Sequence, residues 1–379
     1  MTPIEGTINP EVIERELAQL WQQTARAVLQ DLEPGEERAT MRARVANLMI
    51  YVSSEVVQNE VNEILSELSS HHPCRALVMI AAPEATDRDI DVGVNSFCHG
   101  DAEKSLRRLC CEEVSLSASG RYVVELPSAA IPLLVPDLPV FLWWREDLQR
   151  NAAVFAELAD RADRVIIDSA DLRNPGRQMA VLGSIVSSKD EGQAGFSDLN
   201  WARLTSWRAL LAGFFDTELD RTALDQIVNV RVDYAAKEGE AATLASQPLL
   251  IAGWLASRLN WKITKPAAHV TKGSHTVKFE HDGRPIQADF LQAEPHQLLP
   301  GRLARIILTT RDSTAFEVSR SQDGLYLQTS INHELAMKHA RVSPSHTRSV
   351  ADLLSGEMDI LCRDLMWEEA VRKAAEIAG

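Results

Sequence analysis

Short motifs that mark phosphate-binding and hydrolytic enzymes are missing from this sequence of 379 residues. No glycine stands directly before a lysine, so the chain has no phosphate loop. It also has no Gly-x-Gly-x-x-Gly, Gly-x-Ser-x-Gly or His-Glu-x-x-His motif. These absences argue against a kinase or a dehydrogenase of the standard kind, and we expect no catalytic residues and no cofactor.

Basic residues are in short supply as well, with 39 Lys and Arg against 54 Asp and Glu, a formal net charge of −15. Such a chain repels phosphates, so we expect no nucleic-acid partner. The longest apolar runs, such as Ala76–Ala82, are far shorter than the roughly 18–20 residues of a membrane span, so we expect no membrane contact. The first residues lack a secretory pattern and the five cysteines form no regular framework, which together predict a cytoplasmic protein.

What the sequence does contain is the composition of a globular protein, 45% hydrophobic and 25% charged, at a length that predicts two domains. In residues 1–222, buried strands alternate with helices, which predicts an α/β domain with a mixed, mostly parallel sheet flanked by helices. Residues 223–379 carry hairpin turn signals at Asp282-Gly283 and Asp323-Gly324. We expect an α+β domain there, with an antiparallel sheet covered by helices.

The stretch Asp137–Arg145 reads as the central strand of the first domain. Apolar side chains alternate on both of its faces, which is the pattern of a strand covered by helices on both sides. Its carboxyl end delivers Trp143, Trp144 and Arg145 to the edge where open α/β sheets usually bind ligands. One indole is expected in the core. The other, with Arg145, has the residue types enriched at protein–protein hot spots, so we predict a partner-binding surface here.

A second cluster of tryptophan and arginine lies on the helix predicted over residues 201–215. Trp201, Arg203, Trp207 and Arg208 are spaced so that their side chains occupy neighbouring faces of one helix. We predict that they also bind a partner. The alternative is that the two tryptophans only anchor this helix to the sheet. For the two arginines we favour an exposed role.

Few other residues suggest chemistry. Asp168 follows a predicted buried strand and is a candidate ligand-binding residue, but it could equally cap the next turn or pair with an arginine. Cys110-Cys111 is interpreted as two buried small residues rather than a redox or metal pair, because neighbouring strand residues point to opposite faces. The stretch His71–Arg75 is interpreted as a turn that leads into a strand. We predict no metal site.

Several longer segments resemble the OpcA family, the glucose-6-phosphate dehydrogenase assembly proteins of cyanobacteria, actinobacteria and related bacteria. The similar segments are Arg44–Tyr51, His72–Arg75, Cys110–Val114, Pro132–Trp144, Asp163–Ser169, Asp198–Arg208 and Trp254–Trp261. The last of these, Trp-Leu-Ala-Ser-Arg-Leu-Asn-Trp, is similar to the family's Trp-Leu-Ala-x-x-Leu-x-Trp. The segments run in order over nearly the whole chain, and none is a generic motif.

The resemblance implies a non-catalytic protein that binds the glucose-6-phosphate dehydrogenase oligomer, favours its active form and raises its response to substrate. It would thereby support NADPH production in the oxidative pentose phosphate pathway. The family implies no defined binding site, so the partner-binding residues above are chosen by residue type alone.

Two other classes of protein stay open. A sugar-phosphate-binding enzyme or sensor would use the carboxyl ends of the strands, near Asp168 and Arg145. A purely structural oligomerisation module would associate with itself and leave every dehydrogenase unaffected.

Overall fold

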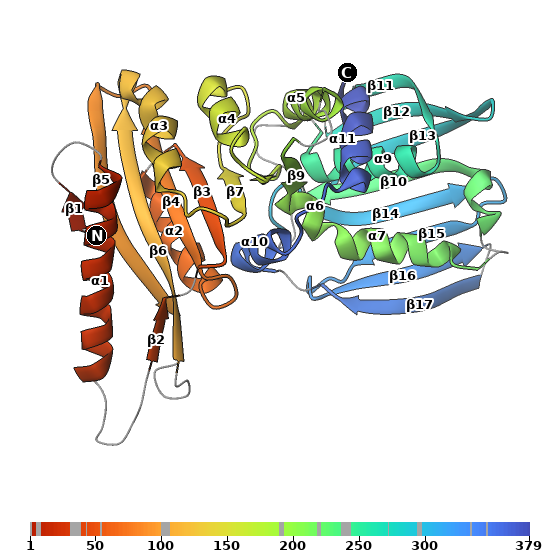
Figure 1. The fold of residues 1–379 in the computed structure, drawn as a ribbon. Helices are drawn as coiled ribbons and strands as arrows, with labels where there is room; N and C mark the ends of the chain where they lie inside the picture. The colour runs from red at the N-terminus through yellow and green to blue at the C-terminus, as the bar shows by residue number, and fades with distance from the viewer. Residues whose placement is uncertain are drawn as a thin grey trace. The chain divides into compact units, whose positions relative to one another are not determined.

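A computed structural model describes residues 2–4, 9–30, 39–42, 44–53, 55–99, 107–188, 193–217, 221–235, 244–271, 273–293, 298–333, 336–345 and 348–379 (Figure 1). The chain forms two compact units, and each is built around one sheet. Unit 1 comprises Met1–Asp168, Glu191–Leu199 and Ser349–Arg363, and unit 2 comprises Ser169–Asp190, Asn200–Arg348 and Asp364–Gly379.

This division differs from the single domain boundary that the sequence predicted after residue 222. Strands β8 (Arg164–Ile167) and β9 (Gly195–Asp198) extend the sheet of unit 1. The helix between them, α5 (Pro175–Ser187), instead packs in unit 2 against α11 (Leu365–Ala378). Contacts between elements far apart in the sequence decide which unit an element joins, and a boundary read from local patterns cannot include them.

Nine strands form the sheet of unit 1 within the described residues, in the order β1-β5-β6-β4-β3-β7-β8-β9 with β2 beside β6. The remaining bounds are β1 (Thr2–Ile4), β2 (Ala39–Arg42), β3 (Ala46–Val52), β4 (Cys74–Ala82), β5 (Arg88–His99), β6 (Arg107–Ser119) and β7 (Val140–Trp144). Neighbouring strands are parallel, except that β5 is antiparallel to both β1 and β6. The mixed, mostly parallel sheet predicted from the sequence is confirmed.

The parallel part of this sheet is doubly wound. Apart from the short β2 beside β6, its strands in chain order are β3, β4, β6, β7, β8 and β9, and across the sheet they lie in the order 3-2-1-4-5-6. The order reverses between β3 and β7, whose residues are almost all buried. The predicted central strand is β7, and it is apolar on both faces because helices cover both faces of the sheet.

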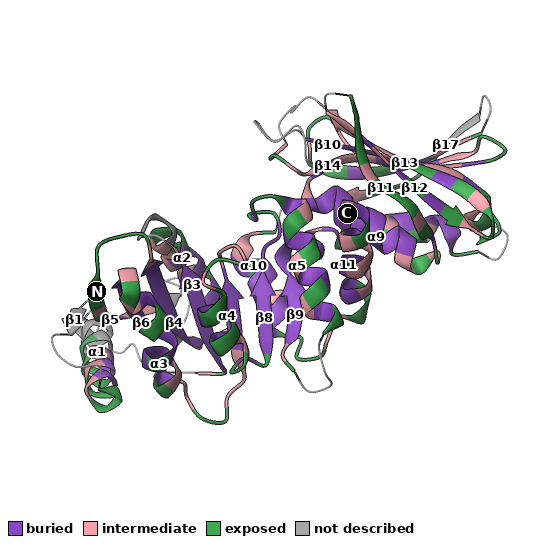
Figure 2. Ribbon diagram, turned by 90° about the horizontal axis from the view of Figure 1, so that it is seen from above, coloured by how far each residue is buried: buried purple, intermediate pink, exposed green. Residues whose placement is uncertain are grey.

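The helices of unit 1 lie on the two faces of its sheet (Figure 2). On one face are α1 (Pro10–Gln30), α3 (Leu126–Ala130) and α4 (Ala152–Ala159), and on the other are α2 (Glu55–Leu68) and α10 (Val350–Met358). Short 3-10 helices, η1 (Gly120–Glu125) and η2 (Ile131–Leu133), flank α3. Two side-chain contacts confirm which helix covers which face. Glu14 of α1 accepts a hydrogen bond from Arg75, and Glu357 of α10 accepts one from Arg164. The strand register places Arg75 and Arg164 on opposite faces of the sheet.

Eight strands form the sheet of unit 2 in the described part of the chain, in the order β11-β12-β13-β10-β14-β15-β16-β17. Their bounds are β10 (Ile227–Ala235), β11 (Lys262–Thr271), β12 (Ser274–His281), β13 (Arg284–Ala293), β14 (Leu303–Thr310), β15 (Ala315–Arg320), β16 (Tyr326–His333) and β17 (Ala336–Pro344). All neighbours are antiparallel except β10 and β13. Gly283 and Gly324 have φ near +73° in the turns of the two predicted hairpins, a conformation that favours glycine.

Helices cover one face of the unit 2 sheet (Figure 1). The longest, α11, packs against α9 (Ser246–Arg258) and α5, while α7 (Thr205–Ala212) packs against β15. The α+β architecture predicted for the second half is confirmed. The single helix predicted over 201–215 is wrong in detail: α6 (Leu199–Arg203) and α7 are separated at Leu204, and the 3-10 helix η3 (Gly213–Phe215) follows. Another 3-10 helix, η4 (Leu224–Gln226), precedes β10.

Candidate partner-binding site

Both tryptophans of the predicted surface at the end of β7 lie in the core of unit 1. Trp143 and Trp144 are each 1% exposed. Trp144 stacks on Tyr51 with ring centroids 4.1 Å apart, and Phe155 of α4 meets the Trp144 ring edgewise at 5.0 Å. The expectation that one indole is exposed is wrong, because β7 is a central strand with both faces covered.

Arg145 follows β7 at the point where the strand order reverses. Its backbone N–H donates to the carbonyl of Tyr51, which joins the ends of β7 and β3. Its guanidinium carbon lies 4.9 Å from the centre of the Trp143 ring, and Nη2 donates to Glu60 of α2 at 3.1 Å. The side chain is only 11% exposed. In doubly wound sheets a ligand usually binds near this position, and here Arg145 contacts Trp143 and Glu60 of its own unit.

The second predicted cluster lies in unit 2. Trp201 and Trp207 are each 3% exposed, so they anchor α6 and α7, as the alternative interpretation expected. The guanidinium carbon of Arg208 lies 3.5 Å from the centre of the Trp201 ring, and Nη2 donates to the Trp201 carbonyl at 3.3 Å. Arg203 is half-buried. The partner-binding role of Arg203 and Arg208 stays a prediction, and the tryptophans are core residues.

Exposed apolar side chains adjoin Arg208 at the start of α11. Nη1 of Arg208 donates to Sδ of Met366 at 3.5 Å. Met366 and its neighbour Leu365 are 41% and 63% exposed. A guanidinium beside apolar side chains is a common composition of protein–protein contacts. We therefore define Arg208, Leu365 and Met366 as the Arg208 patch. The sequence did not indicate Met366, because only folding brings it to Arg208. Leu365 belongs to the patch as the exposed chain neighbour of Met366.

Asp168 lies directly after β8, as predicted, and is buried. The residue that follows it, Ser169, begins a chain of hydrogen bonds within unit 2 that the sequence did not reveal. Asn200 donates to Oγ of Ser169 at 3.1 Å, and Gln247 donates to Oδ1 of Asn200 at 2.8 Å. The N–H of Leu303 donates to Oε1 of Gln247 at 3.0 Å. These buried amides satisfy one another, and the ligand-binding role of Asp168 stays a prediction.

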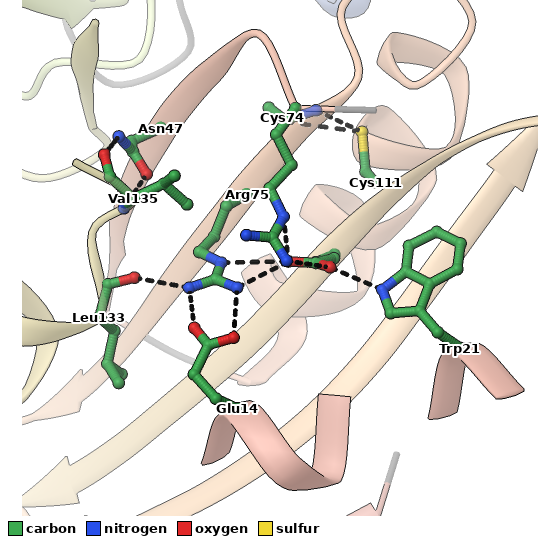
Figure 3. Close-up of polar contacts among 10 residues, drawn as sticks. Glu14, Trp21, Asn47, Cys74, Arg75, Cys111, Leu133 and Val135 are labelled. Atoms are coloured by element: carbon green, nitrogen blue, oxygen red, sulfur yellow. Dashed lines mark hydrogen bonds and ion pairs between the residues drawn. The ribbon is translucent and has the colours of Figure 1, made fainter. Parts of the chain in front are cut away.

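A buried cluster of charges, shown in Figure 3, ties α1 to the sheet of unit 1. Arg75 of β4 is 2% exposed and donates to Oε2 of Glu112 on β6, from Nε at 3.1 Å and from Nη2 at 2.9 Å. The same guanidinium forms an ion pair with Glu14 of α1. Trp21 and Arg44 donate to Oε1 of Glu112 at 2.6 and 2.9 Å.

The interpretation of His71–Arg75 as a turn before a strand missed this cluster. Burial opposes the charge of Arg75, but hydrogen bonds and ion pairs with Glu14 and Glu112 outweigh it and raise the pKa of Arg75. The available signal was an arginine and a glutamate inside two otherwise apolar strands, because such residues are seldom buried without a partner. Each charged group of the cluster contacts a group of opposite charge, so we interpret the cluster as structural.

Glu113, on the opposite face of β6 from Glu112, is a buried carboxyl group. Both of its oxygens are buried, and the polar group beside them is the side chain of Asn95, opposite on β5. Burial raises the pKa of Glu113, and the side chain of Asn95, which lies opposite on β5, offsets this rise only in part. The folded state therefore binds the proton more tightly than the unfolded state. The stabilisation from that proton is complete at low pH and is lost as the pH rises through the raised pKa.

We expect Glu113→Gln to raise the free energy of unfolding at about pH 7.5 by about 1 kcal/mol, a common size for a single-site effect. The glutamine amide is neutral and has the shape of the protonated carboxyl group. The variant and the original protein should therefore be equally stable at about pH 4, which is below the ordinary pKa of a glutamate. Urea unfolding at both pH values measures this. A variant less stable than the original at the higher pH would contradict the prediction.

Two kinds of feature are absent from the part of the chain that the structure describes. None of its helices is long and apolar enough to cross a membrane. No group of three or more His, Cys, Asp or Glu side chains in that part is placed to hold a metal ion.

The fold defines a class of protein: a doubly wound α/β unit, and an α+β unit with a helix-covered, mostly antiparallel sheet. Sequence comparison then places the chain in a family. A model described as the glucose-6-phosphate dehydrogenase subunit N-terminal domain matches residues 65–184, and one described as the C-terminal domain matches residues 194–371. The chain belongs to the OpcA family of glucose-6-phosphate dehydrogenase assembly proteins, which confirms the resemblance.

Similar curated proteins carry the name OpcA and are attributed to the OxPP cycle. The chain is 33% identical over 199 residues to the one from Nostoc punctiforme, covering 52% of this chain and 40% of that protein. It is 28% identical over 235 residues to the one from Synechocystis sp., covering 61% and 46%. It is 25% identical over 314 residues to the one from Synechococcus elongatus, covering 80% and 67%. The chain thus spans about half the length of the first two relatives.

Solved structures with some likeness are oxidoreductases. An aldose-aldose oxidoreductase from Caulobacter crescentus is 10% identical with a TM-score of 0.47, covering 88% of this chain and 96% of that one. A Gfo/Idh/MocA family oxidoreductase from Vibrio cholerae is 8% identical with a TM-score of 0.44, covering 87% and 95%. A likeness this low says nothing about the chemistry of this chain.

Proposed function

We propose that this protein is a non-catalytic assembly factor and allosteric activator of glucose-6-phosphate dehydrogenase. By this action it supports NADPH production in the oxidative pentose phosphate pathway of the cytoplasm. The observation that carries the proposal is the match of residues 65–184 and 194–371 to two family models named for subunits of that dehydrogenase. The OxPP cycle names of the relatives support the pathway.

The geometry of unit 1 supports a binding role over a catalytic one. A doubly wound sheet usually takes its ligand where the strand order reverses. At that place the Tyr51–Trp144 stack and the Arg145–Glu60 ion pair occupy the strand ends. The buried charges Arg75 and Arg164 are likewise matched by carboxylates of their own unit. These aromatic and charged side chains are therefore engaged within their own unit, which supports a binding role.

An activator must bind the active state of its partner more tightly than the inactive state. A tenfold shift in apparent substrate affinity requires a difference of only about 1.4 kcal/mol, which a few surface contacts can supply. Arg203 and the Arg208 patch are our candidates for those contacts. Trp201 contributes by holding the Arg208 guanidinium over its ring. Arg145 is held in the same way above Trp143.

The central test measures dehydrogenase activity against glucose 6-phosphate concentration, with and without this protein, using the dehydrogenase of the same organism. We expect the curve to move to lower substrate concentration and the two proteins to co-elute. An unchanged curve together with separate elution would refute the proposal. Direct binding of glucose 6-phosphate to this protein alone, lost in Asp168→Asn, would favour the sugar-phosphate alternative.

We expect Arg208→Ala to raise the concentration needed for half-maximal activation about tenfold, the effect of losing about 1.4 kcal/mol of contact free energy. Lys278→Ala, which removes one positive charge from an exposed position of β12 in the same unit, is the matched control and should leave the concentration unchanged. Circular dichroism confirms that both variants are folded. Equal effects of the two substitutions would show that net charge, not the Arg208 patch, matters.

A further inference from the structure

Four of the five cysteines occupy three adjacent strands of unit 1. The strand β6 carries Cys110 and Cys111 in succession. Cys98 of β5 lies opposite Cys110 in the antiparallel register, and for this pair only the register is described. On the other side of β6, the parallel register pairs Arg75 with Glu112, which places Cys74 of β4 opposite Cys111. Each cysteine of β6 therefore has a cysteine beside it on a neighbouring strand.

The Cys74 and Cys111 side chains meet in the interior of the sheet (Figure 3). Their Sγ atoms are 3.6 Å apart, and both residues are fully buried. Neighbouring strands lie about 4.8 Å apart, which is within the roughly 4.4–6.8 Å between Cα atoms that a disulfide spans. We propose that Cys74 and Cys111 are a built disulfide site that a small oxidant closes. The sequence could not indicate that Cys111 meets Cys74, which is distant in the chain, rather than its neighbour Cys110.

Both sulfur atoms take part in hydrogen bonds, and the Cys111 thiol can also donate to the carbonyl oxygen of His72 at 3.5 Å. The backbone N–H of Cys74 donates to Sγ of Cys111 at 3.2 Å, and the Cys74 thiol lies within hydrogen-bond distance of the same atom. The hydrogen bond from the Cys74 thiol lowers the pKa of Cys111 against the opposing effect of burial. The same bond, together with burial, raises the pKa of Cys74. Cys111 is accordingly the nucleophile, and Cys74 is the thiol that closes the bridge.

The burial of both thiols selects the oxidant. Hydrogen peroxide is small and uncharged enough to enter during local opening, whereas glutathione disulfide is too large to reach the pair in the folded protein. The Cys111 thiolate attacks peroxide, forms a sulfenic acid and releases hydroxide, which takes up the proton that Cys111 lost. The Cys74 sulfur then attacks the Cys111 sulfur, forming the S–S bond and releasing water. In total, two thiols and one peroxide give one disulfide and two waters.

The bridge would join β4 to β6 at the residues that directly precede Arg75 and Glu112. It would close a loop between residues 37 apart in the sequence and so restrict the unfolded chain. We expect the oxidised protein to melt about 5–10 °C higher than the reduced protein, provided the native strands accept the bridge without distortion. Reduction with dithiothreitol should restore the original melting temperature.

The experiment treats the folded protein with hydrogen peroxide, alkylates the remaining thiols in denaturant and maps the peptides by mass spectrometry. We expect the number of free thiols to fall by two and a Cys74–Cys111 linked peptide to appear. In Cys74→Ser, dimedone should trap a sulfenic acid at Cys111 and no linked peptide should form. Cys362→Ser, which removes an exposed cysteine, is the control and should form the bridge normally.

Glutathione disulfide supplies the second arm of the experiment. It should modify exposed Cys362 in the folded protein and leave Cys74 and Cys111 as free thiols. Recovery of Cys74 and Cys111 as free thiols after peroxide treatment would overturn the proposal. So would a bridge found only between Cys98 and Cys110. A Cys74–Cys111 bridge that lowers the melting temperature would show that the native strands must distort to close it, and would overturn the claim that the site is built for it.

Discussion

We expect Arg75→Met to lower the free energy of unfolding by about 3–5 kcal/mol, the usual cost of removing one partner from a buried ion pair. Methionine keeps much of the apolar volume of the arginine stem but removes both hydrogen bonds to Oε2 of Glu112, which is 1% exposed and keeps Arg44 and Trp21 as partners. It also removes the ion pair that ties α1 to β4 through Glu14. Equilibrium unfolding in urea measures the loss, and hydrogen exchange should show weaker protection of α1.

The matched control is Arg150→Met. Arg150 is 43% exposed and its ion pairs with Glu84 and Glu146 are 3.8 and 3.7 Å long. Exposed pairs of this kind contribute about 0–1 kcal/mol, because water already solvates both charges. If Arg75→Met were no more destabilising than Arg150→Met, the cluster of Figure 3 would not be the clamp that its geometry indicates.

The second large effect is expected at Gly253 in α9. Glycine in a helix usually costs about 0.5–1 kcal/mol relative to alanine, so Gly253→Ala would stabilise an isolated helix. Here a Cβ atom would lie 2.2 Å from the carbonyl oxygen of Ala370 and 2.8 Å from the backbone nitrogen of Ala374, both in α11. Backbone atoms in a packed helix cannot move aside, so α9 and α11 must separate. We expect Gly253→Ala to lower the free energy of unfolding by about 1–3 kcal/mol, the cost of overpacking.

Gly356 in α10 provides the matched control for this substitution. A Cβ atom there meets nothing within 4 Å. Gly356→Ala should therefore raise the free energy of unfolding by about 0.5–1 kcal/mol, because only the helix propensity changes. In one thermal unfolding experiment, we expect the free energy of unfolding to fall for Gly253→Ala and to rise for Gly356→Ala. The same sign for both would mean that α9 and α11 do not approach as closely as the structure places them.

Local patterns in the sequence were enough to predict the class of each sheet. Strand β7 was recognised from apolar side chains on both faces, and the two hairpins of unit 2 from Asp-Gly turns, because periodicity and turn chemistry act over a few residues. The same patterns failed at Leu204, where one predicted helix is two. They gave no signal that α5 and α10 belong to units built mostly from other parts of the sequence.

The candidate site was predictable only in part, for a related reason. Residue type singled out Trp143, Trp144, Trp201 and Trp207, but tryptophan serves cores as readily as interfaces. Their burial depends on which helices cover the strands. Residue type also singled out Arg208, which is half-buried in unit 2 and whose binding role stays a prediction. Its neighbour Met366 lies 158 residues further along the chain and gave no local signal.

The sequence by itself determined the two kinds of sheet, the family, and the chemical character of the chain: acidic and without a recognisable catalytic motif. Hydrophobic alternation, turn residues and short similar segments are local properties, so they can be read in order along the chain. Only the tertiary structure decided which polar residues meet. The Arg75–Glu112 ion pair, the Cys74–Cys111 thiol pair and the Arg208 patch each join residues distant in sequence. Such contacts depend on strand order and register, which local patterns do not encode.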